Sequence, residues 1–147
     1  MKMYVRFGAM IATSTVIMFG LMYLNTYAVD HVLFSETRAY MALVMGAAMA
    51  VIMLSFMPHM LDNKAVNAAI YVGSVIVFAA ALWLVRSQTA VDQVSYMKAM
   101  IPHHSIAILT SERARISDPR VRKLANQIVE TQRKEIAEMK ALIADLE

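Results

Sequence analysis

The sequence contains no cysteine, which excludes disulfide bonds and metal sites built on thiolates. Charged residues make up only 17% of its 147 residues, whereas soluble domains average about 25%. Glycine and proline are scarce, and no Gly-rich phosphate loop, strand pattern or low-complexity run is found. Hydrophobic residues, by contrast, make up 59% of the chain. This composition argues against a disordered chain and against an ordinary soluble domain.

The few charges are distributed unevenly along the chain. Residues 1–85 contain four basic and three acidic side chains, and residues 86–147 contain ten and eight. The chain therefore divides into an apolar half and a charged tail, which have to be interpreted separately.

Three long apolar runs occupy the first half: 18 residues at 7–24, 23 at 39–61 and 21 at 65–85. At about 1.5 Å per residue, each helix can cross a hydrocarbon core of roughly 30 Å. We therefore predict an all-α membrane protein whose residues 1–88 form three transmembrane helices, at about 5–27, 39–61 and 65–85. The first run exceeds the roughly 7–15 apolar residues of a signal-peptide core, which favours an uncleaved anchor.

The orientation follows from the flanking charges. Lys2 and Arg6 favour a cytoplasmic N-terminus, and the loop at 28–38 carries two acids and a single arginine. Three crossings then place the tail outside, although Arg86 directly after the third run argues against this. Aromatic residues gather at the predicted outer ends, as in an interfacial belt: Tyr23, Tyr27, Tyr40 and Trp83.

Residues 89–147 show the period of amphipathic helices, broken by a helix start at Asp118 and Pro119. We expect two antiparallel helices. The second has an apolar stripe of residues three and four apart, widened by Ile136 and Ile143: Val121, Leu124, Ile128, Gln132, Glu135, Met139, Leu142 and Leu146. A two-helix hairpin has a marginal core. We therefore expect it to complete a bundle by homo-oligomerisation.

The most informative segment lies on the first tail helix. On a helix, Met97, Met100 and His104 share a face and His103 lies on its flank. Two imidazoles and two thioethers without a thiolate form a donor set that favours Cu(I). Single methionines at such positions usually serve as packing, and a single histidine is usually hydrogen-bonded. The combination within two helical turns nevertheless makes all four candidate ligands.

The second tail helix carries polar residues inside its apolar stripe. Gln132 and Glu135 are costly there unless they are paired. In an antiparallel hairpin they can face the histidines, accept an imidazole N–H and fix its tautomer. Met139, one turn after Glu135, is a further candidate ligand.

Residues 96–147 resemble the bacterial family called domain of unknown function 305. The resemblance rests on Met97 through His104, on Asp118-Pro119, and on the stretch from Ile128 to Met139 that includes Gln132 and Glu135. It implies a ferritin-like helical domain outside the cytoplasm, with some members linked to copper binding and copper tolerance. The sequence departs from the family pattern at Thr110, where many members have methionine, and at Leu142, where many have an aromatic residue.

Methionines also recur every four residues on the second membrane run, at Met41, Met45, Met49, Met53 and Met57, followed by His59. One hypothesis is a soft-metal path through the membrane, with His59 at one end and His31 at the other. The alternative is adaptable packing between helices.

These observations predict a membrane-anchored, periplasmic copper-binding protein of the bacterial inner membrane. It would sequester Cu(I) or pass it to a copper efflux or maturation protein. The alternative is an oligomeric structural or interaction protein without a metal role. An enzyme is not expected, because no glutamate precedes a histidine by three residues, as di-iron bundles require. Nucleic-acid binding is not expected either, because the tail's basic residues alternate with acids.

Overall fold

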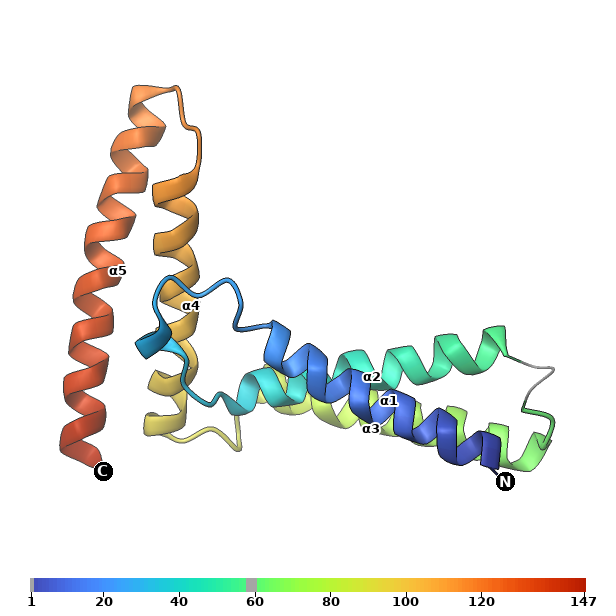
Figure 1. Ribbon diagram of the computed structural model, residues 1–147. Helices are drawn as coiled ribbons and strands as arrows, with labels where there is room; N and C mark the ends of the chain where they lie inside the picture. Colours follow the sequence, from blue (N-terminus) through green and yellow to red (C-terminus); the bar gives the residue numbers. More distant parts are fainter. Residues whose placement is uncertain (1, 58–60) are drawn as a thin grey trace. The chain divides into compact units, whose positions relative to one another are not determined.

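The computed structural model describes residues 2–57 and 61–147, and all regular structure in these ranges is helical (Figure 1). In chain order it comprises α1 (Lys2–Leu21), the short 3-10 helix η1 (Val29–His31), α2 (Glu36–Phe56), α3 (Lys64–Ser87), α4 (Gln93–Arg113) and α5 (Pro119–Leu146). The chain divides into two compact units. The apolar unit is residues 1–22 and 37–90, and the charged unit is residues 23–36 and 91–147.

The three helices of the apolar unit, α1, α2 and α3, are each long and apolar enough to cross a membrane. Their bounds differ from the predicted ones at one connection. The first helix ends at Leu21 rather than near residue 27, and α2 begins at Glu36 rather than residue 39. Hydropathy extended α1 because residues 22–27 are mostly apolar or aromatic, yet these residues leave the helix.

Small residues form the buried face of α2. They are Ala42, Gly46, Ala47 and Ala50, followed by Leu54. A Cβ atom added at Gly46 would overlap the hydroxyl of Thr15 on α1. Gly46 therefore allows α1 and α2 to approach closely, as small residues do between membrane helices. At the other end of α1, the Tyr4 hydroxyl lies 2.9 Å from Asn67 Oδ1 and accepts the Asn63 N–H at 3.0 Å, which ties α1 to the start of α3.

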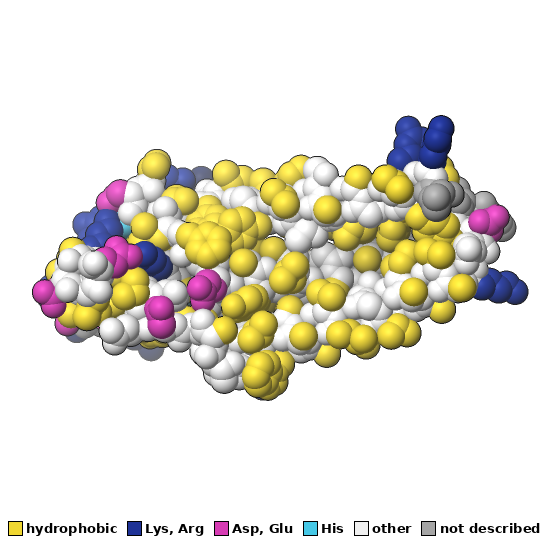
Figure 2. Space-filling view, turned by 90° about the horizontal axis from the view of Figure 1, so that it is seen from below, with side chains coloured by type: hydrophobic (Ala, Val, Ile, Leu, Met, Phe, Trp, Pro, Cys, Tyr) yellow, Lys and Arg dark blue, Asp and Glu magenta, His cyan; other side chains and the backbone are white. Residues whose placement is uncertain are grey.

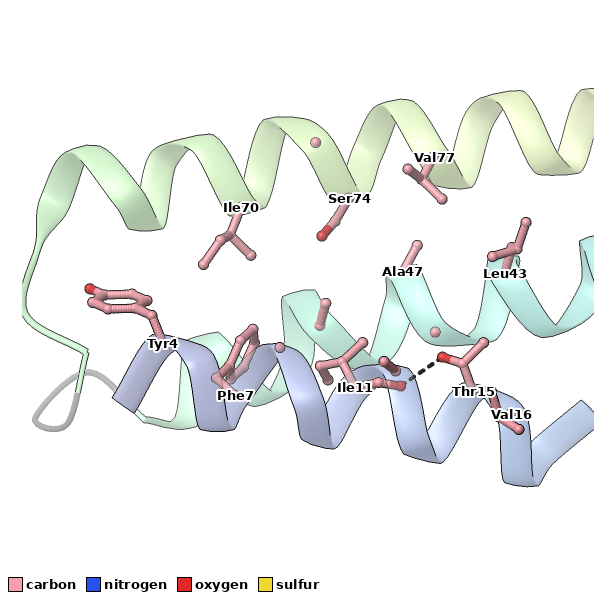
Figure 3. A pocket seen from close by; sticks show the side chains of 15 residues that line it. Tyr4, Phe7, Ile11, Thr15, Val16, Leu43, Ala47, Ile70, Ser74 and Val77 are labelled. Atoms are coloured by element: carbon pink, nitrogen blue, oxygen red, sulfur yellow. Dashed lines mark hydrogen bonds between the residues drawn. The ribbon is translucent and has the colours of Figure 1, made fainter. Parts of the chain in front are cut away.

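A groove of about 670 Å³ lies among the three helices of this unit (Figure 3). Phe7 and Ile11 of α1 and Ile70 and Val77 of α3 point into it, over a floor of small residues on α2. The Thr15 hydroxyl at its wall donates to the Ile11 carbonyl at 2.8 Å. The residues that line the groove are therefore suited to contact with apolar groups and do not form a set of metal ligands.

The charged unit is built on α4 and α5. Its core is formed by Met97, Ile101 and Ile108 of α4 with Ile136 and Ile143 of α5. Lys98 near the start of α4 pairs with Glu147 at the end of α5, and Glu112 near the end of α4 accepts from Arg133 at 2.6 Å. The two helices therefore run in opposite directions along one another, as Figure 1 shows.

The segment between α1 and α2 belongs to the charged unit, although the sequence suggested a single division near residue 88. Leu33 packs against the apolar core of α4 and α5. Asp30 accepts from Lys140 at 2.6 Å, and the guanidinium of Arg133 lies 5.8 Å from the centre of the Tyr27 ring. These contacts hold the segment against α4 and α5, which accounts for the early end of α1. The prediction missed this end because hydropathy contains no information about such long-range pairs.

Candidate metal site on α4 and α5

The methionine–histidine segment lies in the first half of α4. The Asp92 carboxylate caps this helix by accepting the Ser95 N–H at 2.7 Å. Pro102 lies inside the helix and is buried. Proline supplies no N–H, so the helix lacks one backbone hydrogen bond beside the two histidines.

His104 is held by acceptor oxygens at both ring nitrogens. Its Nδ1 lies 2.9 Å from the Met100 carbonyl oxygen, and its Nε2 lies 2.9 Å from Oε2 of Glu135 on α5. A carbonyl oxygen only accepts, so Nδ1 carries a proton in this arrangement. The ring is 12% exposed, whereas the Glu135 side chain is 45% exposed. The Met100 carbonyl thus orients the ring so that Nε2 is directed towards Glu135 on α5.

Gln132 lies one turn before Glu135 and acts on the carboxylate rather than on a histidine. Its Nε2 donates to Glu135 Oε2 at 3.0 Å, the same oxygen that faces His104. Gln132, Glu135 and His104 therefore form one hydrogen-bonded row that links α5 to α4.

The other candidate ligands are in different environments. His103 is exposed, and its ring centre lies 6.0 Å from that of His104, with the two planes at 66°. Met100 is half-buried. Met97 is buried inside the apolar core, and Met139 packs against the same core. The structure therefore brings His103, His104 and Met100 together near the surface and places Met97 and Met139 in the packing of the two helices.

The methionines of α2 do not form its buried face. Met41 is exposed, and Met45, Met49, Met53 and Met57 are half-buried. Met53 and Met57 pack against a cluster that includes Phe7 and Leu54. His59, the expected end of the metal path, lies outside the described residues. Small residues occupy the face of α2 that a continuous internal path would need.

A second polar cluster was not found by sequence reasoning. Ser105 is fully buried, and its Oγ accepts the Tyr27 N–H at 2.7 Å and lies 2.9 Å from His31 Nδ1. Burial lowers the pKa of His31 below its ordinary value of 6.5, and the ammonium group of Lys140 lowers it further. The hydrogen bond from Lys140 likewise lowers the pKa of Asp30. No local sequence signal joins residues 27–31 to Ser105, because the link is entirely tertiary.

The grouping of histidine and acidic side chains bears on whether this unit could hold a metal. Across residues 2–57 and 61–147, no three His, Asp or Glu side chains are grouped as a metal site would require. The thioether of Met100 does not count among these side chains, and thioether with imidazole is a donor set that suits Cu(I). A ligating imidazole commonly donates its other N–H to a carbonyl, which His104 already does.

Comparison with known proteins places the charged unit in a family. Residues 84–147 match the family model described as Domain of unknown function (DUF305). The chain is also 32% identical over 106 residues to Uncharacterized protein L153 of Acanthamoeba polyphaga mimivirus, which covers 71% of this chain and 68% of the relative. The 106 aligned residues are more than residues 84–147 contain, so that similarity extends further into the apolar unit than the family match does. No solved structure matches the chain.

Proposed function

The chain belongs to the DUF305 family, and on that premise we propose that it is a membrane-anchored copper-binding protein. The proposed site is on α4, with His103, His104 and Met100 as ligands for Cu(I). Met97 and Met139 lie beside this site and can contribute a thioether only by leaving the apolar core. The protein would sequester the ion or pass it to an efflux or maturation partner.

The observation that carries this proposal is the setting of His104. Its Nδ1 lies 2.9 Å from the Met100 carbonyl oxygen, and its Nε2 lies 2.9 Å from the Glu135 carboxylate on α5. The exposed His103 is the next residue, so two imidazoles are available at one place on the surface. Copper at Nε2 would take the place of the Glu135 carboxylate at that nitrogen, and the hydrogen bond from Gln132 would keep the displaced carboxylate in position.

We further propose that α1, α2 and α3 cross the bacterial inner membrane, with the N-terminus in the cytoplasm and the charged unit in the periplasm. The length and hydropathy of the three helices support the crossings. Lys2 and Arg6 at the start of α1 support the orientation, because cytoplasmic ends of membrane helices are enriched in basic residues. Copper binding would then take place outside the cytoplasm.

Elemental analysis of the full chain, purified from copper-supplemented cells, tests the proposal. We expect copper in the wild type and a loss of most of it in the His103→Ala/His104→Ala variant. The control is His31→Gln, which removes from the same unit an imidazole that contacts the Ser105 hydroxyl rather than the Met100 carbonyl or Glu135. Copper retained at full stoichiometry by the double variant would refute the site.

The alternative is a structural membrane protein in which these side chains only pack. It is favoured by the burial of Met97 in the core and by the complete hydrogen bonding of His104. A ligand that binds only the native state stabilises it by about 2.7 kcal/mol when its free concentration is 100 times its dissociation constant. Cu(I) should therefore raise the Tm of the wild type but not that of the double-histidine variant, and an unchanged wild-type Tm would favour the alternative.

A further inference from the structure

Helix α5 has a second apolar face that the charged unit leaves uncovered. Ala125, Ile136 and Ile143 face α4 and are buried. On the side of α5 next to them, Arg133 and Lys140 contact the segment at 23–36. The remaining side carries five aliphatic residues, each between 36% and 56% exposed: Val121, Leu124, Ile128, Leu142 and Leu146.

We name this side the α5 stripe, defined by Val121, Leu124, Ile128, Gln132, Glu135, Met139, Leu142 and Leu146. It corresponds to the stripe given by the sequence pattern without Ile136 and Ile143, which widened that stripe and which the structure buries in the core. The core uses the neighbouring face, displaced by about one residue around the helix. An exposed aliphatic row of this length on the charged unit indicates an interaction surface.

The order of side chains along the α5 stripe is symmetric about its centre. Three aliphatic residues precede the polar pair Gln132 and Glu135, and three apolar residues follow it. Val121 and Ile128 lie as far before Gln132 as Leu146 and Met139 lie after Glu135, whereas Leu124 and Leu142 depart from mirrored positions by one residue. If a second α5 is laid alongside in the opposite direction, Val121 meets Leu146, Leu124 meets Leu142 and Ile128 meets Met139. The same alignment sets Gln132 opposite Glu135. Self-complementarity of this kind is what a two-fold interface between identical chains requires.

We propose that a second copy of this chain covers the α5 stripe, with the two α5 helices packed antiparallel about an axis between Gln132 and Glu135. The polar centre selects this partner. A parallel copy would place Glu135 against Glu135, and a membrane surface would take Glu135 and Gln132 into apolar surroundings with no partners beyond those of their own chain. An antiparallel copy instead offers the Gln132 amide as a donor to the carboxylate, a bond this side chain already makes within one chain at 3.0 Å.

The pairing has a consequence for the metal site. Glu135 lies at the centre of the α5 stripe and 2.9 Å from His104. The axis therefore brings the methionine–histidine segments of both copies to one place, and each copy contributes residues beside the other's site. This consequence rests on the proposed copper function, whereas the pairing itself does not.

Cysteine cross-linking of the full chain in membranes, without added copper, tests the pairing, because the chain has no cysteine of its own. Two differently tagged variants, Leu124→Cys and Leu142→Cys, are produced together and oxidised. We expect disulfide-linked dimers that contain both tags. Ala137→Cys is the matched control, since Ala137 is exposed on the opposite side of α5 and should give only background cross-linking.

Two outcomes overturn the proposal. Cross-linking of Leu124→Cys to itself in preference to Leu142→Cys indicates a parallel pair. Mixed dimers no more abundant than those of Ala137→Cys indicate that something other than a second copy covers the α5 stripe. Both substituted leucines are exposed within one chain, so loss of folding is not expected to obscure the result.

A second variant separates the pairing from the copper proposal. Leu142→Glu should abolish the dimer in detergent solution, and Ala137→Glu should leave it unchanged. If the site is shared, Leu142→Glu also loses most of its copper although its histidines are intact. If the monomeric variant binds as much copper as the wild type, the shared site is refuted, but the pairing and the proposed function are not. If the cysteine variants cross-link as expected but the wild type binds no copper, the proposed function alone is refuted.

Discussion

The two units of the chain are both helical, but their helices pack with different side chains. The apolar unit buries alanine, glycine and serine, with Leu54 as one of its few large buried side chains. The charged unit buries Ile101, Ile108, Ile136 and Ile143. In water, large aliphatic side chains drive helices together because their burial removes apolar surface from solvent. In lipid that driving force is absent, so close backbone approach through small residues takes its place.

The surfaces of the two units show the same contrast. No more than 28% of the most apolar window of α1, α2 or α3 is buried, so most of their hydrophobic side chains face outward. Figure 2 shows such side chains along the length of these helices, with charged groups gathered at the ends. On the charged unit, exposed apolar side chains are concentrated in the α5 stripe and in residues 24–34. Exposure of apolar side chains is thus general in one unit and localised in the other.

The largest expected effect compares equivalent deletions in the two cores. Ile101 and Leu54 are both almost fully buried. Ile101→Ala should lower the free energy of unfolding of the charged unit by about 2–5 kcal/mol, because it loses both hydrophobic transfer and packing. Leu54→Ala should cost roughly half as much, because its unfolded reference is still in lipid and only packing is lost. Hydrogen exchange of α4 and α5 and SDS titration of the apolar unit measure the two values.

The exposed Val29 in the charged unit provides the control for the first deletion. Val29→Ala should change stability by no more than about 0.5 kcal/mol. If Leu54→Ala costs as much as Ile101→Ala, the apolar unit is stabilised by the same hydrophobic term as a soluble core, and the contrast drawn between the two units is wrong.

A smaller effect is expected at the contact between α1 and α2. Gly46→Ala places a methyl group against the Thr15 hydroxyl, which is itself held by the Ile11 carbonyl. We expect a loss of about 1–3 kcal/mol in the SDS titration. Gly73→Ala is the matched control, because a Cβ there meets nothing within 4 Å. It should be neutral or stabilising by up to about 1 kcal/mol. The Thr15→Ala/Gly46→Ala double variant should recover most of the loss, and no recovery would mean that Gly46 does not act through Thr15.

Hydropathy alone was sufficient to find the three long helices of the apolar unit. It did not find where α1 ends, because residues 22–27 are apolar enough to continue a membrane helix. In the structure they leave the helix, and the segment that follows contacts residues far along the chain. Lys140 and Ser105 make those contacts more than seventy residues away. A sequence window contains no trace of such pairs, so the assignment of residues 23–36 to the charged unit required the structure.

Periodicity gave the helices of the charged unit but not the face that α5 buries. Apolar residues cover two adjoining faces of α5, and spacing alone does not distinguish a face covered by α4 from one left exposed. The predicted stripe included the buried Ile136 and Ile143, but it also included Leu124 and Leu142, which are exposed, and it missed Ala125. The motif at 97–104 was visible because it is local. The position of Glu135 against His104 depends on the register between two helices.

The smallest expected effect concerns acid, and it distinguishes the loop contacts of the charged unit from its apolar core. Burial and Lys140 lower the pKa of His31 below 6.5, while Asp30 opposes the shift. The folded protein therefore binds fewer protons here than the unfolded chain. The contribution of neutral His31 is complete above about pH 6.5 and is lost as the pH falls below that value. Asp30, whose pKa is lowered from 3.8, affects stability only at more acidic pH.

Hydrogen exchange of residues 23–36 between pH 7 and pH 5, corrected for the intrinsic exchange rate, measures this effect. The wild type should lose protection towards pH 5, and His31→Gln should lose less, because glutamine keeps a polar contact to Ser105 and does not titrate. Protection of the core amides around Ile101 and Ile136 should change little in either protein. An identical loss in both proteins would assign the acid sensitivity to another group. The segment at 23–36 would then be held by the apolar contact of Leu33 rather than by its polar link to Ser105.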